Sequence, residues 1–177
     1  MLPLRHAVLR TGRPWADAHY LQDDEPSSAH FAAFGALETL GAGTLGAGTL
    51  GADDAHELGA VLGVGSVLPE PPEWREPLSD ATNAHCWRVR GMATRQDLRG
   101  SGLGSRILAS LLDHAKTEGG GLVWCTARIG ASTFYERAGF TARGGIAHVP
   151  GIGPHRTMWL EIDQDEIDQD DSPHDRL

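Results

Sequence analysis

A glycine-rich turn offers the clearest chemistry in this sequence. Residues 99–105 read Arg-Gly-Ser-Gly-Leu-Gly-Ser, and they stand where an apolar run gives way to a long amphipathic pattern. The first N–H groups of a helix lack intrahelical partners and carry the positive end of its dipole, and glycines let several N–H groups converge on one anion. Arg99 adds a permanent positive charge. The segment therefore predicts a cradle for a pyrophosphate at the start of a helix.

Two better-known phosphate motifs do not fit this turn. No Gly-Lys-Ser/Thr follows it, as a Walker loop requires, and its Gly-x-Gly-x-Gly spacing differs from the Gly-x-Gly-x-x-Gly of dinucleotide-binding folds. No acidic residue stands at the position expected to bind a ribose. Taken alone, the motif leaves a purely structural turn open as the alternative.

The elements that must position the turn follow from hydrophobic periodicity. Leu103, Ile107, Leu111 and Ala115 form one apolar stripe, which predicts a helix over about 102–116. Short helices are expected at 4–12 and 131–138, a loop at 13–28, and strands at 30–34, 60–68, 86–94, 122–126, 141–149 and 157–162. A strand, a long helix and a strand in succession predict a parallel pair, while the outer strands predict antiparallel hairpins. The expected fold class is therefore α/β, with a mixed, mostly antiparallel central sheet flanked by helices.

Chain length and composition predict one domain over residues 1–162. Residues 41–56 repeat Leu-Gly-Ala-Gly-Thr, and a five-residue unit is too short to build a solenoid, so we interpret this segment as a Gly-rich insertion in a hairpin connection. Residues 163–177 are acidic and polar, which predicts a disordered tail.

Charge and cysteine usage exclude several classes of function. The chain carries a net charge of −9 without a basic stripe, so we expect no nucleic-acid partner. Cys86 and Cys125 lie in apolar runs and are expected to be buried thiols in a reducing compartment, and no Cys/His spacing predicts a metal. Because the sequence shows neither a signal peptide nor an apolar run that could span a bilayer, we expect a cytoplasmic protein without a membrane partner.

A second motif follows the next predicted strand. Residues 131–140 read Ala-Ser-Thr-Phe-Tyr-Glu-Arg-Ala-Gly-Phe, and the turn at 99–104 reads Arg-x-x-Gly-x-Gly. In this order and context the two motifs resemble the signatures of the GNAT family of N-acetyltransferases. The segment Val149-Pro-Gly-Ile-Gly-Pro-His155 also resembles a bacterial-type subgroup of that family. The resemblance is strong over residues 85–162 and looser over residues 1–84. It implies an acyl-CoA N-acyltransferase fold whose sheet is splayed at a bulge, and acetyl-CoA as co-substrate with no metal.

The resemblance also implies where acetyl-CoA binds. Its pantetheine arm would pair, like an extra strand, with the backbone of Met92, Ala93 and Thr94. Its pyrophosphate would lie on Arg99, Gly100, Ser101, Gly102, Leu103, Gly104 and Ser105. A backbone N–H in the strand would stabilise the oxyanion while an amine attacks directly.

Tyr135 is the residue to which the resemblance assigns acid catalysis. It matches the position that protonates the departing thiolate in many relatives. A phenol with a pKa of about 10 can act as the general acid for the thiolate of a thiol with a pKa of about 8.5. A packing tyrosine is the alternative. Since strand 86–94 contains no carboxylate, the general base stays open between His155, His85 and a chain of waters. Arg128 stands where many relatives carry Asn, and it would either bind a CoA phosphate or lie on the surface.

The acceptor is expected to be a small-molecule amine or a peptide amine, bound in a cleft built from residues 13–28, 69–83 and 144–156. Two rival functions remain: a degenerate member of the family that binds and senses acyl-CoA without turnover, and a small interaction domain whose glycines are structural. Exposed edge strands often pair in this architecture, which leaves a homodimer open.

Overall fold

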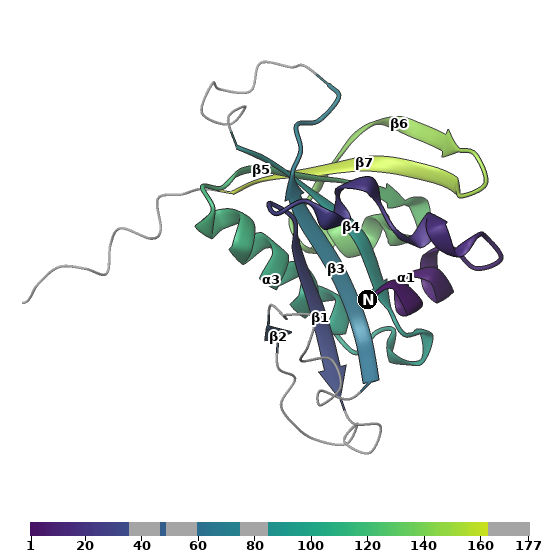
Figure 1. The fold of residues 1–177 in the computed structure, drawn as a ribbon. Coiled ribbons are helices and arrows are strands. Elements are labelled where there is room, and N and C mark those ends of the chain that lie inside the picture. Colours follow the sequence, from purple (N-terminus) through teal and green to yellow (C-terminus); the bar gives the residue numbers. More distant parts are fainter. Residues whose placement is uncertain (36–46, 49–59, 75–84, 163–177) are drawn as a thin grey trace, which may run out of the picture.

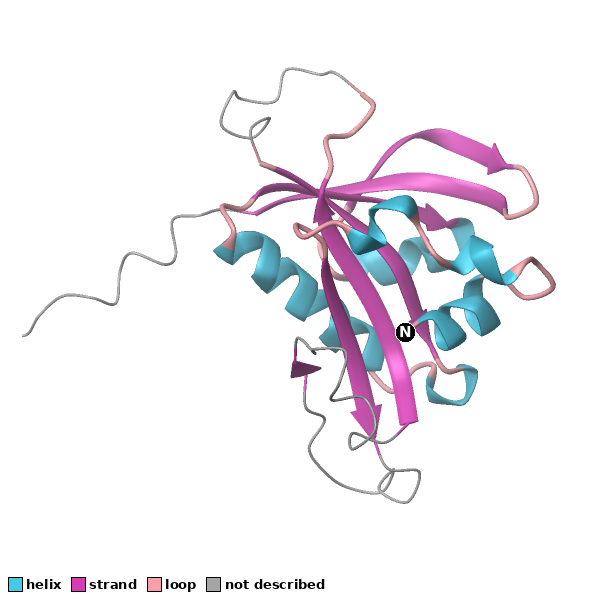
Figure 2. Cartoon of the chain, viewed as in Figure 1, coloured by secondary structure: helices cyan, strands magenta, loops and turns pink. Residues whose placement is uncertain are grey.

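The computed structural model describes residues 1–35, 47–48, 60–74 and 85–162, which form one mixed sheet with helices on both faces (Figures 1 and 2). The strands are β1 (Ala29–Gly35), β2 (Ala47–Gly48), β3 (Ala60–Pro69), β4 (Cys86–Thr94), β5 (Gly121–Arg128), β6 (Thr141–Val149) and β7 (Gly153–Ile162). The α-helices are α1 (Leu2–Leu9), α3 (Leu103–Thr117) and α4 (Ser132–Arg137), and the 3-10 turns are η1 (Trp15–Ala18), η2 (Leu21–Asp24), η5 (Gln96–Leu98) and η6 (Ile129–Ala131).

The strand order confirms the predicted fold class. The described strands follow the order β2-β1-β3-β4-β5-β7-β6. Among them, β4 and β5 pair in parallel around α3, and the other neighbours are antiparallel. The predicted strand–helix–strand unit, β4-α3-β5, therefore lies at the centre of a mostly antiparallel sheet.

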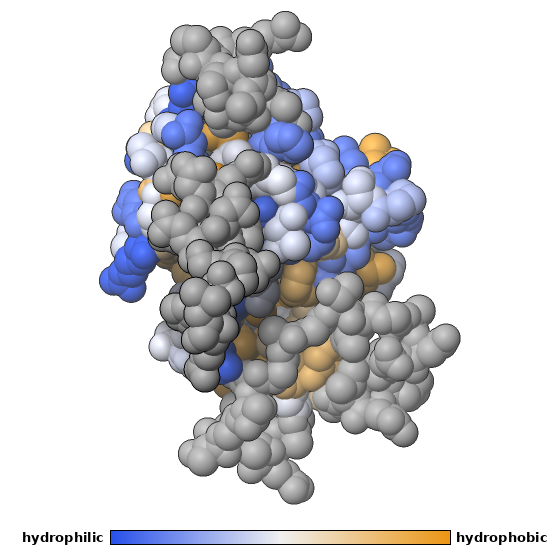
Figure 3. All heavy atoms as spheres, turned by 90° about the vertical axis from the view of Figure 1, so that its left-hand side faces the viewer, coloured by the Kyte–Doolittle hydropathy of each residue, from blue (hydrophilic) through white to orange (hydrophobic). Residues whose placement is uncertain are grey.

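Two apolar clusters hold the helices to opposite faces of the sheet. Helix α3 buries the predicted stripe against one face through Leu103, Ile107, Leu108, Leu111 and Ala115. Helix α1 packs its apolar residues against Ala32, Val64 and Ala93 on the other face. Seen from the left-hand side of Figure 1, hydrophobic residues lie low on the described surface and hydrophilic residues cover most of its upper part (Figure 3).

Several element boundaries differ from the predicted ones. The first helix spans Leu2–Leu9 rather than 4–12, because a proline at position 3 is tolerated in a first turn, where its missing N–H would have no partner. The loop predicted at 13–28 contains η1 and η2, and the last strand begins at Gly153. The predicted tail at 163–177 lies outside the described residues, as does the insertion at 41–56 apart from β2.

A bulge interrupts the pairing of β3 with β4. Val64 lies opposite Ala93 and Ser66 lies opposite Arg90, so Gly91 and Met92 together oppose the single residue Gly65. A bulge of this kind bends its strand and increases the local twist. Strand β4 accordingly leaves the sheet direction of β5 soon after the two strands begin.

Strands β4 and β5 splay apart beyond a short stretch of parallel pairing. The parallel pairing covers Cys86–Arg88 against Leu122–Trp124, and from there the two strands diverge (Figure 1). The fold thus contains the splayed sheet that the sequence resemblance implies. Past Arg88, the β5 side of β4 presents main-chain groups that β5 does not pair.

Glycine is required at the bulge for two reasons. Gly91 has a φ of +62°, a left-handed conformation that L side chains rarely adopt. A Cβ at this position would also lie 2.6 Å from Nε of Arg5, whose side chain is fully buried. Gly12 provides a comparison, since its φ is +75° and nothing lies within 4 Å of its virtual Cβ.

We expect Gly91→Ala to lower the free energy of unfolding by about 3 kcal/mol, because strain and overlap with Arg5 add, whereas Gly12→Ala should cost about 1 kcal/mol from strain alone. Urea unfolding of both variants measures the difference. Equal losses at the two positions would show that Arg5 does not restrict the bulge.

Candidate active site

The predicted phosphate turn lies between the end of β4 and the start of α3. Gly100 and Gly102 have φ values of +84° and +83°, which turn the backbone sharply into the helix. The first bond into α3 runs from the N–H of Arg106 to the carbonyl of Gly102, at 3.1 Å. The preceding N–H groups, at residues 103–105, therefore have no partner within the helix. N–H groups without helical partners at the start of a helix are suited to an anion.

The surroundings of the turn suit a polyphosphate. Arg99 and Ser101 are exposed beside it, and the first turn of α3 contains no acidic residue. The nearby carboxylate of Asp97 is held by Arg95 at 2.6 and 3.1 Å, so its charge is paired. The residues present therefore fit the pyrophosphate of a nucleotide-containing co-substrate.

The end of β4 runs directly into this turn. The methyl group of Thr94 would lie 3.3 Å from a Cβ on Gly63 and 3.7 Å from one on Gly104, so the strand end packs closely on the start of α3. Met92 packs toward α3, while Ala93 packs toward α1. The backbone of these residues lies on the part of β4 that does not pair with β5. An open strand edge of this kind can accept an extended chain.

Tyr135 lies on α4, buried against the face of the sheet that α3 covers. Its ring packs edge-on against Phe134 and Phe140, with centroids 4.9 and 5.4 Å away, and its hydroxyl donates a hydrogen bond to the thiol of Cys125. Burial, followed by the neighbouring Cys125, raises the pKa of Tyr135 well above its ordinary value. The phenol therefore stays protonated at neutral pH, as a proton donor must. The packing alternative is equally consistent with these contacts.

The two histidines considered as bases lie at different ends of the sheet. His155 is buried on β7, with Nδ1 2.8 Å from the carbonyl of Gly153. His85 precedes β4 and lines a cavity of about 530 Å³ near the end of α3. Gly91 lies six positions after His85, which amounts to about 20 Å along an extended strand. The structure therefore does not bring His85 to the bulge.

Arg128 does not reach toward the phosphate turn. It lies exposed at the end of β5, and its guanidinium donates to the carbonyl of Leu9 at 2.6 Å. This bond joins β5 to the last residue of α1. The sequence left Arg128 either bound to a CoA phosphate or on the surface, and the structure places it on the surface.

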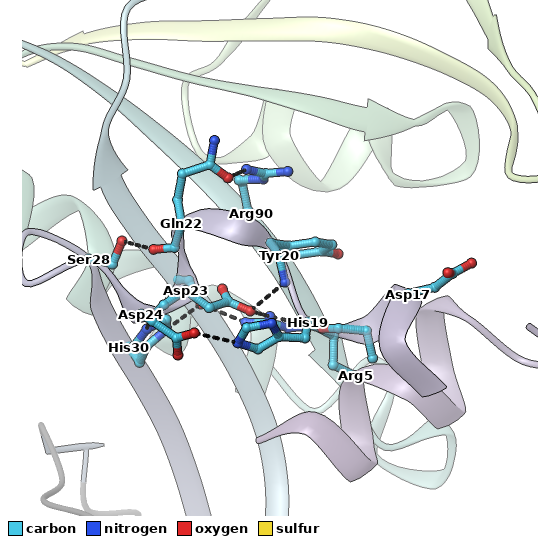
Figure 4. Close-up of polar contacts among 12 residues, drawn as sticks. Arg5, Asp17, His19, Tyr20, Gln22, Asp23, Asp24, Ser28, His30 and Arg90 are labelled. Atoms are coloured by element: carbon cyan, nitrogen blue, oxygen red, sulfur yellow. Dashed lines mark hydrogen bonds and ion pairs between the residues drawn. The ribbon is translucent and has the colours of Figure 1, made fainter. Parts of the chain in front are cut away.

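A charged cluster beside β4 was missed by sequence reasoning. Arg88 forms an ion pair with Glu70, and Nη1 of Arg90 lies 3.8 Å from the other carboxylate oxygen of Glu70. The guanidinium of Arg90 stacks 4.5 Å from the ring centroid of Tyr20 and bonds Gln22 at 2.7 Å (Figure 4). Two arginines spaced two residues apart in an otherwise apolar strand were the available signal, because such residues share one face.

A buried polar network fixes the N-terminal segment over this face. Arg5 is fully buried, pairs with Asp23 and donates to Ser66 Oγ at 2.8 Å and to the carbonyl of Ala18 at 3.1 Å. His30 lies 2.7 Å from the same hydroxyl (Figure 4). One side chain thus joins α1, η1 and η2 to β3.

Comparison with known proteins decides the family. The sequence model described as the acetyltransferase (GNAT) family matches residues 13–140. The chain belongs to this family. A curated relative, the uncharacterised N-acetyltransferase YitI of Bacillus subtilis, is 26% identical over 159 residues, which cover 90% of this chain and 88% of YitI. The family match and this relative both agree with the family that the two sequence motifs indicate.

Solved structures show the same GNAT fold. Escherichia coli ElaA aligns with a TM-score of 0.60 at 16% identity, over 90% of this chain and 87% of ElaA. An aminoglycoside 6'-N-acetyltransferase complexed with coenzyme A aligns with a TM-score of 0.57 at 12% identity, over 90% and 87% of the two chains. In the described part of this chain, no helix is long and apolar enough to cross a bilayer, and no three His, Cys, Asp or Glu residues gather as metal ligands.

The Tyr135–Cys125 pair makes stability depend on alkaline pH. Burial raises the pKa of Cys125 from 9.0 to about 12 and that of Tyr135 above 10.0. The folded state therefore keeps protons that the unfolded state releases, so this contribution is complete below about pH 9 and is lost as pH rises toward 12.

We expect the free energy of unfolding to fall from about pH 9 upward, and to fall less steeply in Tyr135→Phe, which removes one of the two protons. Urea unfolding across this range measures the slope. Tyr20→Phe is the matched comparison, because it removes the other tyrosine of the chain. Parallel slopes for wild type and Tyr135→Phe would contradict the assignment.

Proposed function

We propose that this protein transfers the acetyl group of acetyl-CoA directly to the amine of a small molecule or peptide. The observation that carries the proposal is the continuous path from the open edge of β4 into the glycine turn of α3. Family membership and the coenzyme A complex of a protein with the same fold support it. On this proposal the pantetheine arm pairs with residues 92–94, and the pyrophosphate lies on residues 99–105.

The chain's own groups account for the chemistry of the transfer. Bound acetyl-CoA would supply an acyl group activated as a thioester. Backbone N–H groups at the bulge of β4 would stabilise the negative charge that develops on the carbonyl oxygen, which is usually the largest contribution in acyl transfer. As the amine nitrogen bonds to the carbonyl carbon and the carbon–sulfur bond breaks, Tyr135 would hand its proton to the sulfur. The proton that the nitrogen loses would pass to water, and a proton from water would restore the phenol. Burial raises the pKa of Tyr135, which keeps the phenol protonated but also makes it a weaker acid toward the thiolate.

Acetyl-CoA should raise the melting temperature of the wild type, and Arg99→Ala and Gly102→Trp should lose most of the effect. A ligand that binds only the folded state adds about 2.7 kcal/mol at one hundred times its Kd, or about 5–10 °C for a chain of this size. Lys116→Ala is the control, because it removes a positive charge from the far end of the same helix. A wild type that does not respond to millimolar acetyl-CoA would overturn the proposal.

Tyr135→Phe should lower kcat by about a hundredfold while keeping the stabilisation by acetyl-CoA, because general acid catalysis contributes roughly that much and the cradle is untouched. Release of free CoA thiol with the most active amine of a panel measures the rate. Unchanged kcat across pH would leave Tyr135 a packing residue. Stabilisation by acetyl-CoA without thiol release from any amine would instead support the degenerate acyl-CoA sensor.

A further inference from the structure

Side chains on one face of the sheet gather at the point where β4 and β5 separate. Arg88 is paired with Trp124 in the last described pair of the two strands, and Trp124 lies opposite Trp159 on β7. Two residues further along, Thr157 on β7 lies opposite Arg143 on β6. We call Arg88, Arg90, Arg143, Trp74 and Trp124 the cationic face.

Aromatic rings hold the guanidinium groups of this face. Arg88 lies 4.4 Å from the ring of Trp124, and Arg143 lies 5.0 Å from the ring of Trp74. The two indoles pack edge-on with centroids 5.5 Å apart. A guanidinium stacked on a ring keeps its in-plane N–H groups available for a carboxylate or phosphate. The rings therefore position the arginines without neutralising them.

Among the described residues, the two arginines of β4 face a single carboxylate. Arg88 and Arg90 share one carboxylate, that of Glu70, and the other polar partner of Arg90 is the neutral amide of Gln22. Burial, followed by the positive charge of Arg88, lowers the pKa of Arg90. Nε of Arg88 is buried and has no hydrogen-bond partner among the described residues. A half-buried surplus of this kind is stabilised by an added anion.

The three aspartates of the N-terminal segment are engaged by other residues. Asp23 is paired with Arg5, Asp17 with Arg13 at 2.5 Å, and Asp24 lies 3.1 Å from His19. The network around Arg5 already anchors this segment to the sheet. Arg90 adds contacts to the same segment through Tyr20 and Gln22, whereas Arg88 pairs with Glu70 and stacks on Trp124 instead.

The cationic face lies on the opposite side of the sheet from the groups assigned to the co-substrate. Tyr135 and the start of α3 pack with Val123 and Cys125 on one side of β5, while Trp124 packs with Trp74 and Trp159 on the other. A second substrate that meets the acetyl group at the mouth of the splay would therefore contact Arg90 and its neighbours.

We propose that the acceptor is an amine that also carries an anionic group, a carboxylate or a phosphate, and that the cationic face binds this group. The inference rests on the proposed acetyl transfer and adds the class of its acceptor. Arginine matches both anions with a fork of two N–H groups, and a cationic acceptor would meet like charges. The arginines act as specificity determinants rather than as catalytic residues.

The test compares amines that differ in charge. Thiol release from acetyl-CoA is measured with glutamate, with phosphoethanolamine and with the cationic amines spermidine and kanamycin. We expect a kcat/KM at least tenfold higher for an anionic amine than for either cation. Comparing glutamate with phosphoethanolamine shows whether the cationic face prefers a carboxylate or a phosphate. A higher kcat/KM for spermidine or kanamycin would overturn the inference.

Two variants connect the preference to the cationic face. Arg90→Gln should raise KM for the anionic amine about tenfold with little change in kcat, whereas a merely structural role would lower stability without a selective effect on KM. Arg143→Glu, on the edge strand β6, should shift the preference toward cationic amines even if Arg90→Gln folds poorly. Lys116→Gln is the control for loss of a positive charge and should keep the wild-type preference.

A binding measurement covers the case in which no amine of the panel reacts. With CoA saturating its own site, glutarate and inorganic phosphate should still raise the melting temperature of the wild type, and the rise should be absent in Arg143→Glu. No stabilisation by either anion, together with no turnover of an anionic amine, would overturn the inference. Failure of acetyl-CoA itself to stabilise the protein would overturn the proposed function instead.

Discussion

The separation of β4 from β5 is the constraint on which the rest of the site depends. Two strands that begin as a parallel pair can diverge only if one of them bends, and the bulge at Gly91 and Met92 supplies the bend. Past Arg88, the divergence leaves the main chain of β4 unpaired on the side that faces β5, while its other side stays paired with β3. In most sheets an unpaired edge is a liability, but here it lies inside the molecule, between α1 on one face and α3 and α4 on the other.

The bulge in turn depends on a side chain of the N-terminal helix α1. Arg5 fills the space above Gly91, and its charge is met by Asp23 and its N–H groups by Ser66 and Ala18. These contacts satisfy both terminal nitrogens of Arg5, while its Nε is buried without a hydrogen-bond partner among the described residues. A buried charge is tolerated only when it is paired and hydrogen-bonded to this extent. The conformation of one glycine and the docking of the N-terminal helix are therefore parts of the same arrangement.

Sequence patterns predicted those features that depend on residues close together in the chain. The stripe on α3 and the glycine turn before it depend on neighbours in sequence, and both were predicted to within a residue or two. The pairing of Glu70 with Arg88 and Arg90 was not, because it arises from the antiparallel register of β3 and β4 across the segment between them. The contact of Arg128 with Leu9 spans 119 positions and has no local signature. The roles assigned to Tyr135 and to residues 92–94 and 99–105 stay predictions.

The network around Arg5 also has a consequence for how the chain acquires its structure. Arg5 and Ser66 are 61 positions apart, so the first helix cannot dock until β3 has joined the sheet, and the loop that closes in this step is long. Helix α1 precedes the sheet in the sequence but is therefore among the last elements to be buried. During translation, the apolar side of α1 would remain accessible to chaperones and proteases until the centre of the sheet has formed.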